Sequence, residues 1–277
     1  MEASRIVFDG MHARAQLFGQ RGDRLAVTFL HLRGGREGFV APRPVNRYLA
    51  QGIDHLQVQT AEDDWYLNDD LPALRQALAA LTETYRQVGA IGFSMGGYGA
   101  LLLSRSLRLG QSLLVSPQST PFSDMAPFDP RFEEHEGKCR RDLALSAADI
   151  SPEMRGFVLY DPRHPSADTA HANIIAAMAP RLALVAMPFG GHPCTAPIWE
   201  AGLWGSFQDM LFKPRLTTAH LADIRRQARE SSPSWNRYAG VALLDRETRR
   251  EDASGLLDKA FAPGAHYAKG GEDFTRL

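Results

Sequence analysis

The chain has 277 residues, and its 31 lysines and arginines nearly balance its 32 aspartates and glutamates. This length accommodates one large α/β domain, alone or with a small appendage. A net charge of -1 argues against a protein that its overall charge would draw to nucleic acid or to a membrane surface. No apolar run approaches the roughly 20 residues of a membrane-spanning helix.

The two cysteines and the N-terminus bear on location. Cys139 and Cys194 offer little material for a disulfide framework, and the opening residues lack the features of a signal peptide. We therefore expect a cytoplasmic protein. Cys194 is expected to be a small packed residue and not a nucleophile, because no strand-turn-helix motif surrounds it.

From the N-terminus onward, apolar β-rich runs alternate with helical patterns. A hairpin around Asp9-Gly10 is expected first, and leucines spaced three and four apart after Leu71 indicate an amphipathic helix. The expected strands are residues 5–8, 13–18, 24–32, 55–59, 88–91, 111–116, 157–160 and 182–187. Further helices are expected at about 97–107, 167–178 and 197–211. This alternation predicts an α/β fold with a mostly parallel sheet and helices on both faces.

Two stretches depart from that alternation. Residues 117–156 are rich in proline and charge and are interpreted as a cap inserted into a core of residues 1–212. Residues 213–277 are polar with helical patterning and are interpreted as a C-terminal appendage. A homo-oligomer or a protein partner bound through this tail is an open alternative to a purely structural role.

The stretch from Val88 to Ala100 reads as a short strand, a tight turn around Ser94 and the start of a helix. Gly92 and Gly96 are small enough to let strand and helix approach closely, as a nucleophile elbow requires. The run Ser-Met-Gly-Gly-Tyr-Gly-Ala resembles the elbow of serine esterases of the α/β-hydrolase superfamily, especially relatives of feruloyl esterases and S-formylglutathione hydrolases. The resemblance implies a hydrolase with a Ser-His-acid triad.

The resemblance also implies two backbone donors for an oxyanion hole. One is Met95, which follows the nucleophile. The other comes from the loop after the strand 24–32, where Leu32 or a direct neighbour is the candidate. The usual His-Gly pair of that loop is replaced here by His31-Leu32.

A serine hydroxyl needs a histidine to accept its proton and a carboxylate to orient that histidine. Asp161 and His192 each follow a predicted strand, as Ser94 does, and parallel strands end at one edge of a sheet. Their order along the chain is the α/β-hydrolase order. Asp168 is the competing acid, but its place near the start of a helix has an ordinary explanation as a cap, so Asp161 is preferred.

Together these features predict a serine hydrolase that cleaves a carboxylic ester or thioester through an acyl-enzyme, without a cofactor or metal. Two alternatives stay open: an acyltransferase with the same triad, and a non-catalytic binding module that keeps the elbow as scaffold. The expected partner is a small ester or acyl substrate, with no nucleic acid and no membrane.

Overall fold

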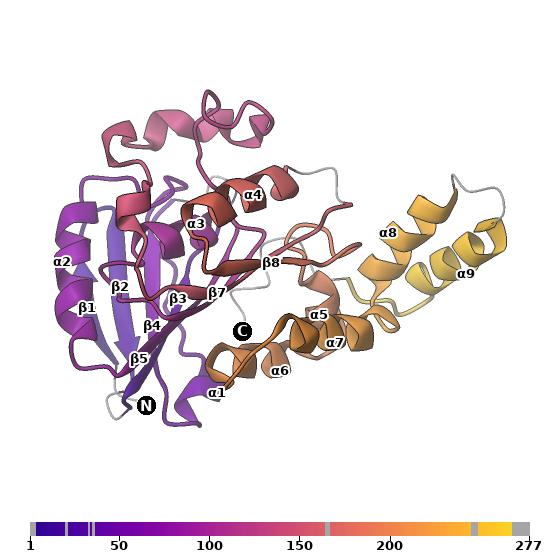
Figure 1. Ribbon diagram of the computed structural model, residues 1–277, viewed down its shortest axis with the longest axis horizontal. Helices are drawn as coiled ribbons and strands as arrows, with labels where there is room; N and C mark the ends of the chain where they lie inside the picture. Colours follow the sequence, from indigo (N-terminus) through magenta and orange to yellow (C-terminus); the bar gives the residue numbers. More distant parts are fainter. Residues whose placement is uncertain are drawn as a thin grey trace.

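The computed structural model describes residues 4–19, 22–32, 34, 37–163, 167–244 and 249–267. Within these residues, eight strands form one sheet in the order β1-β2-β4-β3-β5-β6-β7-β8 (Figure 1). The strands are β1 (Ser4–Asp9), β2 (Ala13–Phe18), β3 (Arg24–Phe29), β4 (Asp54–Thr60), β5 (Gln87–Phe93), β6 (Gln111–Val115), β7 (Arg155–Tyr160) and β8 (Leu182–Ala186).

The sheet is antiparallel only at its N-terminal edge. Strand β1 pairs with β2 through a tight turn, and β2 pairs antiparallel with β4. From β4 to β8 every neighbouring pair is parallel. The predicted α/β class with a mostly parallel sheet is confirmed, and the carboxyl ends of β3, β5, β6, β7 and β8 meet at one edge.

Helices cover both faces of this sheet. Side chains of α2, α3 and α4 join the core on one face, and those of α1, α5, α6 and α7 join it on the other. The α-helices are α1 (Asn46–Leu49), α2 (Leu71–Thr82), α3 (Met95–Leu102), α4 (Asp168–Met178), α5 (Ala196–Glu200), α6 (Trp204–Asp209), α7 (Thr218–Arg229), α8 (Pro233–Leu244) and α9 (Arg250–Ala260). No helix of the described residues has both the length and the apolar character needed to cross a membrane.

Some predicted helices are shorter than expected. Helix α3 ends at Leu102 and gives way to turns, not at about residue 107. The expected helix 197–211 is α5 and α6, interrupted at Gly202, whose φ of +70° breaks a right-handed helix. Residues 117–156 contain short 3₁₀ segments, η1 (Pro130–Lys138), η2 (Arg141–Leu143) and η3 (Ala147–Asp149), and much of this stretch lies above α3 and α4 at the top of Figure 1.

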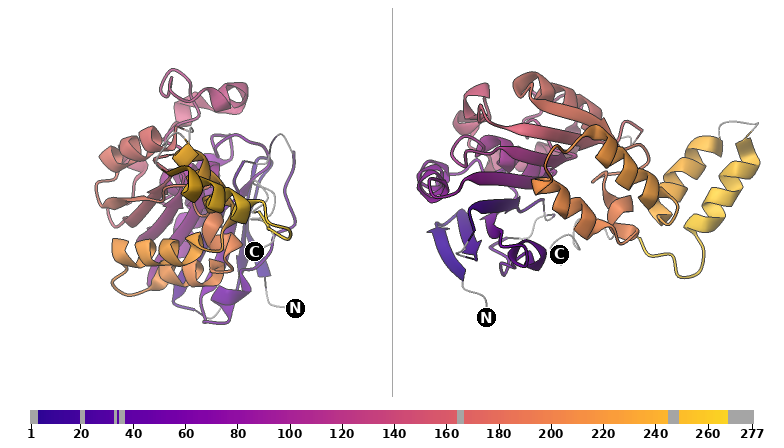
Figure 2. Two further views of the ribbon diagram at one scale, coloured as in Figure 1. Left: turned by 90° about the vertical axis from the view of Figure 1, so that its right-hand side faces the viewer. Right: turned by 60° about the horizontal axis from the view of Figure 1, so that its bottom comes forward.

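The tail begins with a helix that belongs to the core. Leu221, Ile224 and Ala228 of α7 are buried against α5 and β8. Helices α8 and α9 pack on each other and project from the body of the molecule (Figure 2). The packing of α7 therefore favours a core that extends beyond residue 213. A homo-oligomer or protein partner bound through the tail stays a prediction.

His55 is a buried histidine, and we expect it to lower the stability of the fold in acid. His55 of β4 accepts the Val45 N–H at Nδ1 (3.2 Å), and its Nε2 lies 2.8 Å from Thr28 Oγ1. Burial lowers the pKa of His55 to about 3. In the unfolded chain the His55 imidazole is protonated near pH 6.5, whereas in the folded protein it stays neutral down to about pH 3. As the pH falls from 6.5 to 3, the free energy of unfolding should therefore decrease by up to about 1.4 kcal/mol per pH unit.

Urea unfolding across that pH range checks this expectation. In the variant His55→Asn, whose side chain cannot take up a proton, the slope of unfolding free energy against pH should be shallower than in the unchanged protein. Identical slopes would show that His55 does not govern the acid response.

Candidate active site

Ser94 occupies the single residue between the end of β5 and the start of α3. Its backbone has φ +49° and ψ -121°, a strained conformation for a residue with a side chain. Small neighbours permit this turn, because a Cβ on Gly92 would lie 2.6 Å from the Gly96 carbonyl oxygen, and one on Gly96 would lie 2.9 Å from the Phe29 carbonyl oxygen. The turn thus presents a half-buried hydroxyl at the carboxyl edge of the sheet.

Backbone N–H groups at the start of α3 lie next to Ser94. Met95 is the first residue of the helix and is fully buried, and unpaired N–H groups of a helix start favour negative charge. Leu32 lies in the loop after β3 and packs half-buried against the core. The roles of Met95 and Leu32 as oxyanion donors stay predictions.

His192 lies in the loop after β8 and bridges Ser94 to a carboxylate. Its Nε2 is 3.1 Å from Ser94 Oγ, and its Nδ1 is 3.0 Å and 3.1 Å from the two carboxylate oxygens of Asp168. Asp168 is almost completely buried, whereas the His192 side chain is one-fifth exposed. A buried acceptor at Nδ1 holds that proton on the ring and leaves Nε2 to accept the hydroxyl proton of Ser94.

The prediction that Asp161 lies against His192 is wrong. Asp161 accepts hydrogen bonds from the backbone N–H groups of Gly191 and Arg163, each at 2.8 Å. Its carboxylate therefore holds the loop that carries His192 without contacting the ring. The chain instead returns to the sheet edge at the first turn of α4, where Asp168 reaches the imidazole.

Gln118 is a further contact of Ser94 that the sequence analysis missed. Its Nε2 donates to Ser94 Oγ (2.8 Å), while its Oε1 accepts from the Trp65 indole N–H (2.8 Å). An indole nitrogen can only donate, so Trp65 sets which end of the Gln118 amide faces Ser94. The signal was its position, three residues after the end of β6, a neighbour of β5 in the sheet.

A charged group, Arg131, lies beside the carboxylate of Asp168. Arg131 of η1 forms an ion pair with Asp129 (2.6 Å) and lies 3.6 Å from Asp168. Asp129 also lies 2.9 Å from Nε2 of the buried His171. Although burial opposes ionisation, hydrogen bonds from Arg131 and His171 hold the pKa of Asp129 well below its ordinary value. The inserted segment 117–156 therefore supplies an ionised pair beside Asp168.

His171 also contacts a serine. Ser119, His171 and Asp129 therefore form a second hydrogen-bonded Ser-His-Asp series, besides that of Ser94, His192 and Asp168. Ser119 donates to His171 Nδ1 from its backbone N–H (3.1 Å), and its Oγ lies 2.8 Å from the same nitrogen. Both His171 and Ser119 are buried, and no strand-to-helix turn presents the Ser119 hydroxyl. This second Ser-His-Asp series is suited to holding Asp129 in place.

Helix α8 supports the loop of His192 from outside the core. Its Trp235 packs edge-to-face on Phe189, with ring centroids 5.9 Å apart. A Cβ on Gly191 would lie 3.1 Å from the Tyr238 ring, so this glycine lets α8 approach closely. The projecting helices thus contact the site through its histidine loop.

Potential metal ligands and the thiol of Cys194 were the other reactive groups to consider. Among the described residues, no group of three or more His, Cys, Asp or Glu is placed to hold a metal ion. Cys194 is buried, and burial strongly raises the pKa of its thiol, which opposes formation of a nucleophilic thiolate.

Comparison with known proteins places the fold but no family. No family model and no curated protein sequence matches the chain. Among solved structures, the capsule O-acetyltransferase of Neisseria meningitidis serogroup A aligns at a TM-score of 0.50 and 12% identity, covering 71% of this chain and 91% of that one. The Pyrococcus horikoshii acylaminoacyl peptidase aligns at a TM-score of 0.53 and 10% identity, covering 79% and 43%. These similarities agree with an α/β-hydrolase type of fold.

Proposed function

We propose that this protein is a serine hydrolase that cleaves a carboxylic ester or thioester through an acyl-enzyme. The observation that carries the proposal is the continuous hydrogen-bonded chain from Ser94 Oγ through the His192 ring to Asp168. Three features that arise on different elements converge there: a strained serine, a partly exposed histidine, and a buried acid.

In the proposed reaction, Ser94 Oγ attacks the acyl carbonyl carbon while His192 Nε2 takes the hydroxyl proton. The tetrahedral oxyanion would be met by backbone N–H groups at the start of α3, with Met95 the first candidate and Leu32 the second. His192 then protonates the departing alkoxide or thiolate, and the C–O or C–S bond breaks. Water enters, gives a proton to His192 Nε2 and attacks the acyl carbon; His192 then returns that proton to Ser94 Oγ as the bond from Oγ to the acyl carbon breaks and the acid leaves.

Acyl transfer to another acceptor is the second candidate. It uses the same first half-reaction, and only the acceptor of the acyl group differs. The fold similarity to an O-acetyltransferase gives this candidate its support. A non-catalytic role is less well supported, because a buried carboxylate aligned on a histidine costs stability that a scaffold has no reason to keep.

A fluorophosphonate probe, followed by mass spectrometry of the labelled peptide, tests the proposal. We expect one covalent adduct, on Ser94. A panel of p-nitrophenyl esters and acyl thioesters of increasing chain length would then define the acyl group, and added alcohols or amines would reveal transfer in place of hydrolysis. An unlabelled protein that turns over none of these compounds would favour the binding-module alternative.

Gln118→Ala should lower kcat about tenfold with little change in KM. The amide donates to Ser94 Oγ, so its loss removes one hydrogen bond that orients the nucleophile. Gln118→Glu is the matched control, since it keeps the size of the side chain and replaces the donor by an acceptor, and it should be at least as slow. If both variants kept full kcat, Gln118 would have no part in the reaction.

A further inference from the structure

A large cavity lies at the opposite edge of the sheet from Ser94. It measures about 1150 Å³ and is lined where strands β3, β5, β6 and β7 begin. Gln87, the first residue of β5, lines it, while Ser94 follows the last residue of the same strand. Seven residues of strand span about 20 Å, so this cavity is separate from the candidate active site.

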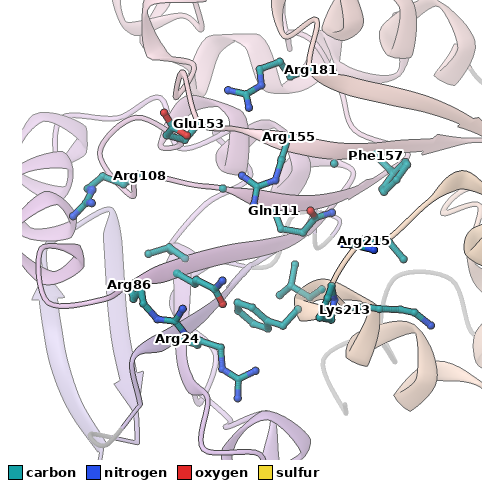
Figure 3. Close-up of a pocket in the computed structure, with 18 of the residues that line it drawn as sticks. Arg24, Arg86, Arg108, Gln111, Glu153, Arg155, Phe157, Arg181, Lys213 and Arg215 are labelled. Atoms are coloured by element: carbon teal, nitrogen blue, oxygen red, sulfur yellow. The ribbon is translucent and has the colours of Figure 1, made fainter.

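Five arginines line this cavity on the side of the sheet, from Arg24 and Arg86 at the lower left of Figure 3 to Arg181 at its top. One arginine lies within three residues of the start of each of five strands that are consecutive in the sheet, β3, β5, β6, β7 and β8. They are Arg24, Arg86, Arg108, Arg155 and Arg181. Because neighbouring strands lie about 4.8 Å apart, the starts of these five strands extend over about 20 Å.

The facing wall adds two more cations. Lys213 and Arg215 come from the segment between η4 (Met210–Phe212) and α7 and line the same cavity (Figure 3). The carboxylates among the described lining residues are Asp23 and Glu153, which leaves an excess of five positive charges in a chain whose net charge is -1. Such a concentration of like charge around a concavity creates a positive potential that attracts anions.

The contacts of these arginines leave donors for a ligand. Arg86 pairs with Asp23 (2.7 Å), and Arg24, Arg108 and Arg181 each donate to one backbone carbonyl, at 3.2, 3.4 and 2.5 Å. A guanidinium carries five N–H donors, so one such bond does not exhaust it. Planar guanidinium groups bind phosphate through two parallel hydrogen bonds.

We propose that this cavity binds a small soluble ligand that carries several phosphate groups. A single anion would engage one or two of the cations, whereas linked phosphates on one molecule can engage cations beside neighbouring strands, which lie about 4.8 Å apart. The aromatic residues of the lining are Phe157, which is almost wholly buried, and Phe212, which lies under Arg24 with 5.7 Å from the guanidinium to the ring centroid. Bases of a single-stranded nucleic acid would find no open ring to stack on, which favours a small polyphosphate.

Isothermal titration calorimetry with inorganic tripolyphosphate at 0.15 M salt, an ionic strength of about physiological level, tests the proposal. We expect one bound molecule per chain. The double variant Arg155→Gln/Arg181→Gln should weaken binding about 100-fold, because each arginine contributes a charge-assisted hydrogen bond. The double variant Arg5→Gln/Arg226→Gln removes the same charge at exposed positions outside the cavity and should change affinity less than threefold.

Equal weakening by both double variants, or no binding to the unchanged protein, would overturn the proposal. Tighter, arginine-dependent binding of an oligouridylate would reassign the cavity to nucleic acid. Fluorophosphonate labelling of Ser94 is expected to be unchanged in all of these variants, so this test and that of the proposed hydrolase are independent.

Discussion

Ser94→Ala should abolish labelling by a fluorophosphonate probe and lower turnover of any ester substrate by about 10⁴-fold or more. The oxygen that forms the acyl bond is removed, and Nε2 of His192, 3.1 Å away, loses the proton that it is placed to accept. The melting temperature should stay close to that of the unchanged protein, because a half-buried hydroxyl is replaced by a smaller group at a strained turn.

Ser119→Ala provides a matched control. Ser119 also contacts a histidine that pairs with an aspartate, yet its hydroxyl is buried and serves to hold His171. This variant should keep probe labelling on Ser94 and most of its turnover. Labelling that persists in Ser94→Ala and disappears in Ser119→Ala would show that Ser119, and not Ser94, is the nucleophile.

Asp168→Asn should lower kcat by about 10⁴-fold in a protein that remains folded. An asparagine amide can present an N–H group to His192 Nδ1, which would place the ring proton on Nε2 and stop that nitrogen from accepting the proton of Ser94. Turnover and melting temperature measured side by side separate this effect from unfolding.

Asp161→Asn should behave in the opposite way. Its carboxylate accepts two backbone N–H groups, and an asparagine can accept at only one of its two terminal atoms. One of the two N–H groups would lose its acceptor: that of the buried Gly191, at a cost of about 1–3 kcal/mol of stability, or that of the exposed Arg163, at a smaller cost because water can replace the carboxylate. We expect a lowered melting temperature with activity reduced far less than in Asp168→Asn. An inactive, normally stable Asp161→Asn beside an active Asp168→Asn would exchange the two roles.

The difference between the two acids shows where sequence reasoning fails. Asp161 directly follows a strand, and the edge rule for parallel sheets favours it. That rule places a residue at the edge but does not say which partner its side chain meets. Asp168, at the start of α4, reaches His192 because α4 packs against β7 and β8. This packing cannot be predicted from the local sequence pattern.

Gln118 and Arg131 illustrate the same limit. Both come from the inserted segment 117–156, whose prolines and charged residues indicate irregular structure. The segment has no helical or strand periodicity from which buried and exposed side chains could be told apart. Gln118 meets Ser94 because β6 lies beside β5, and Arg131 meets Asp168 because η1 lies over α4 through the buried contact of Asp129 with His171. These contacts join residues far apart in the chain.

The sequence by itself determined the elements whose signals are local. Apolar alternation and helical spacing predict an α/β chain, and the glycines around Ser94 predict a strained strand-to-helix turn, because close backbone approach excludes a Cβ at those positions. It also placed Ser94 and His192 at one edge of the sheet. Only the tertiary structure decided that Asp168 contacts His192, that Gln118 donates to Ser94, and that cations near the starts of five strands share one cavity. Those facts depend on strand order and loop path, which arise from burial of the whole core and not from any one segment.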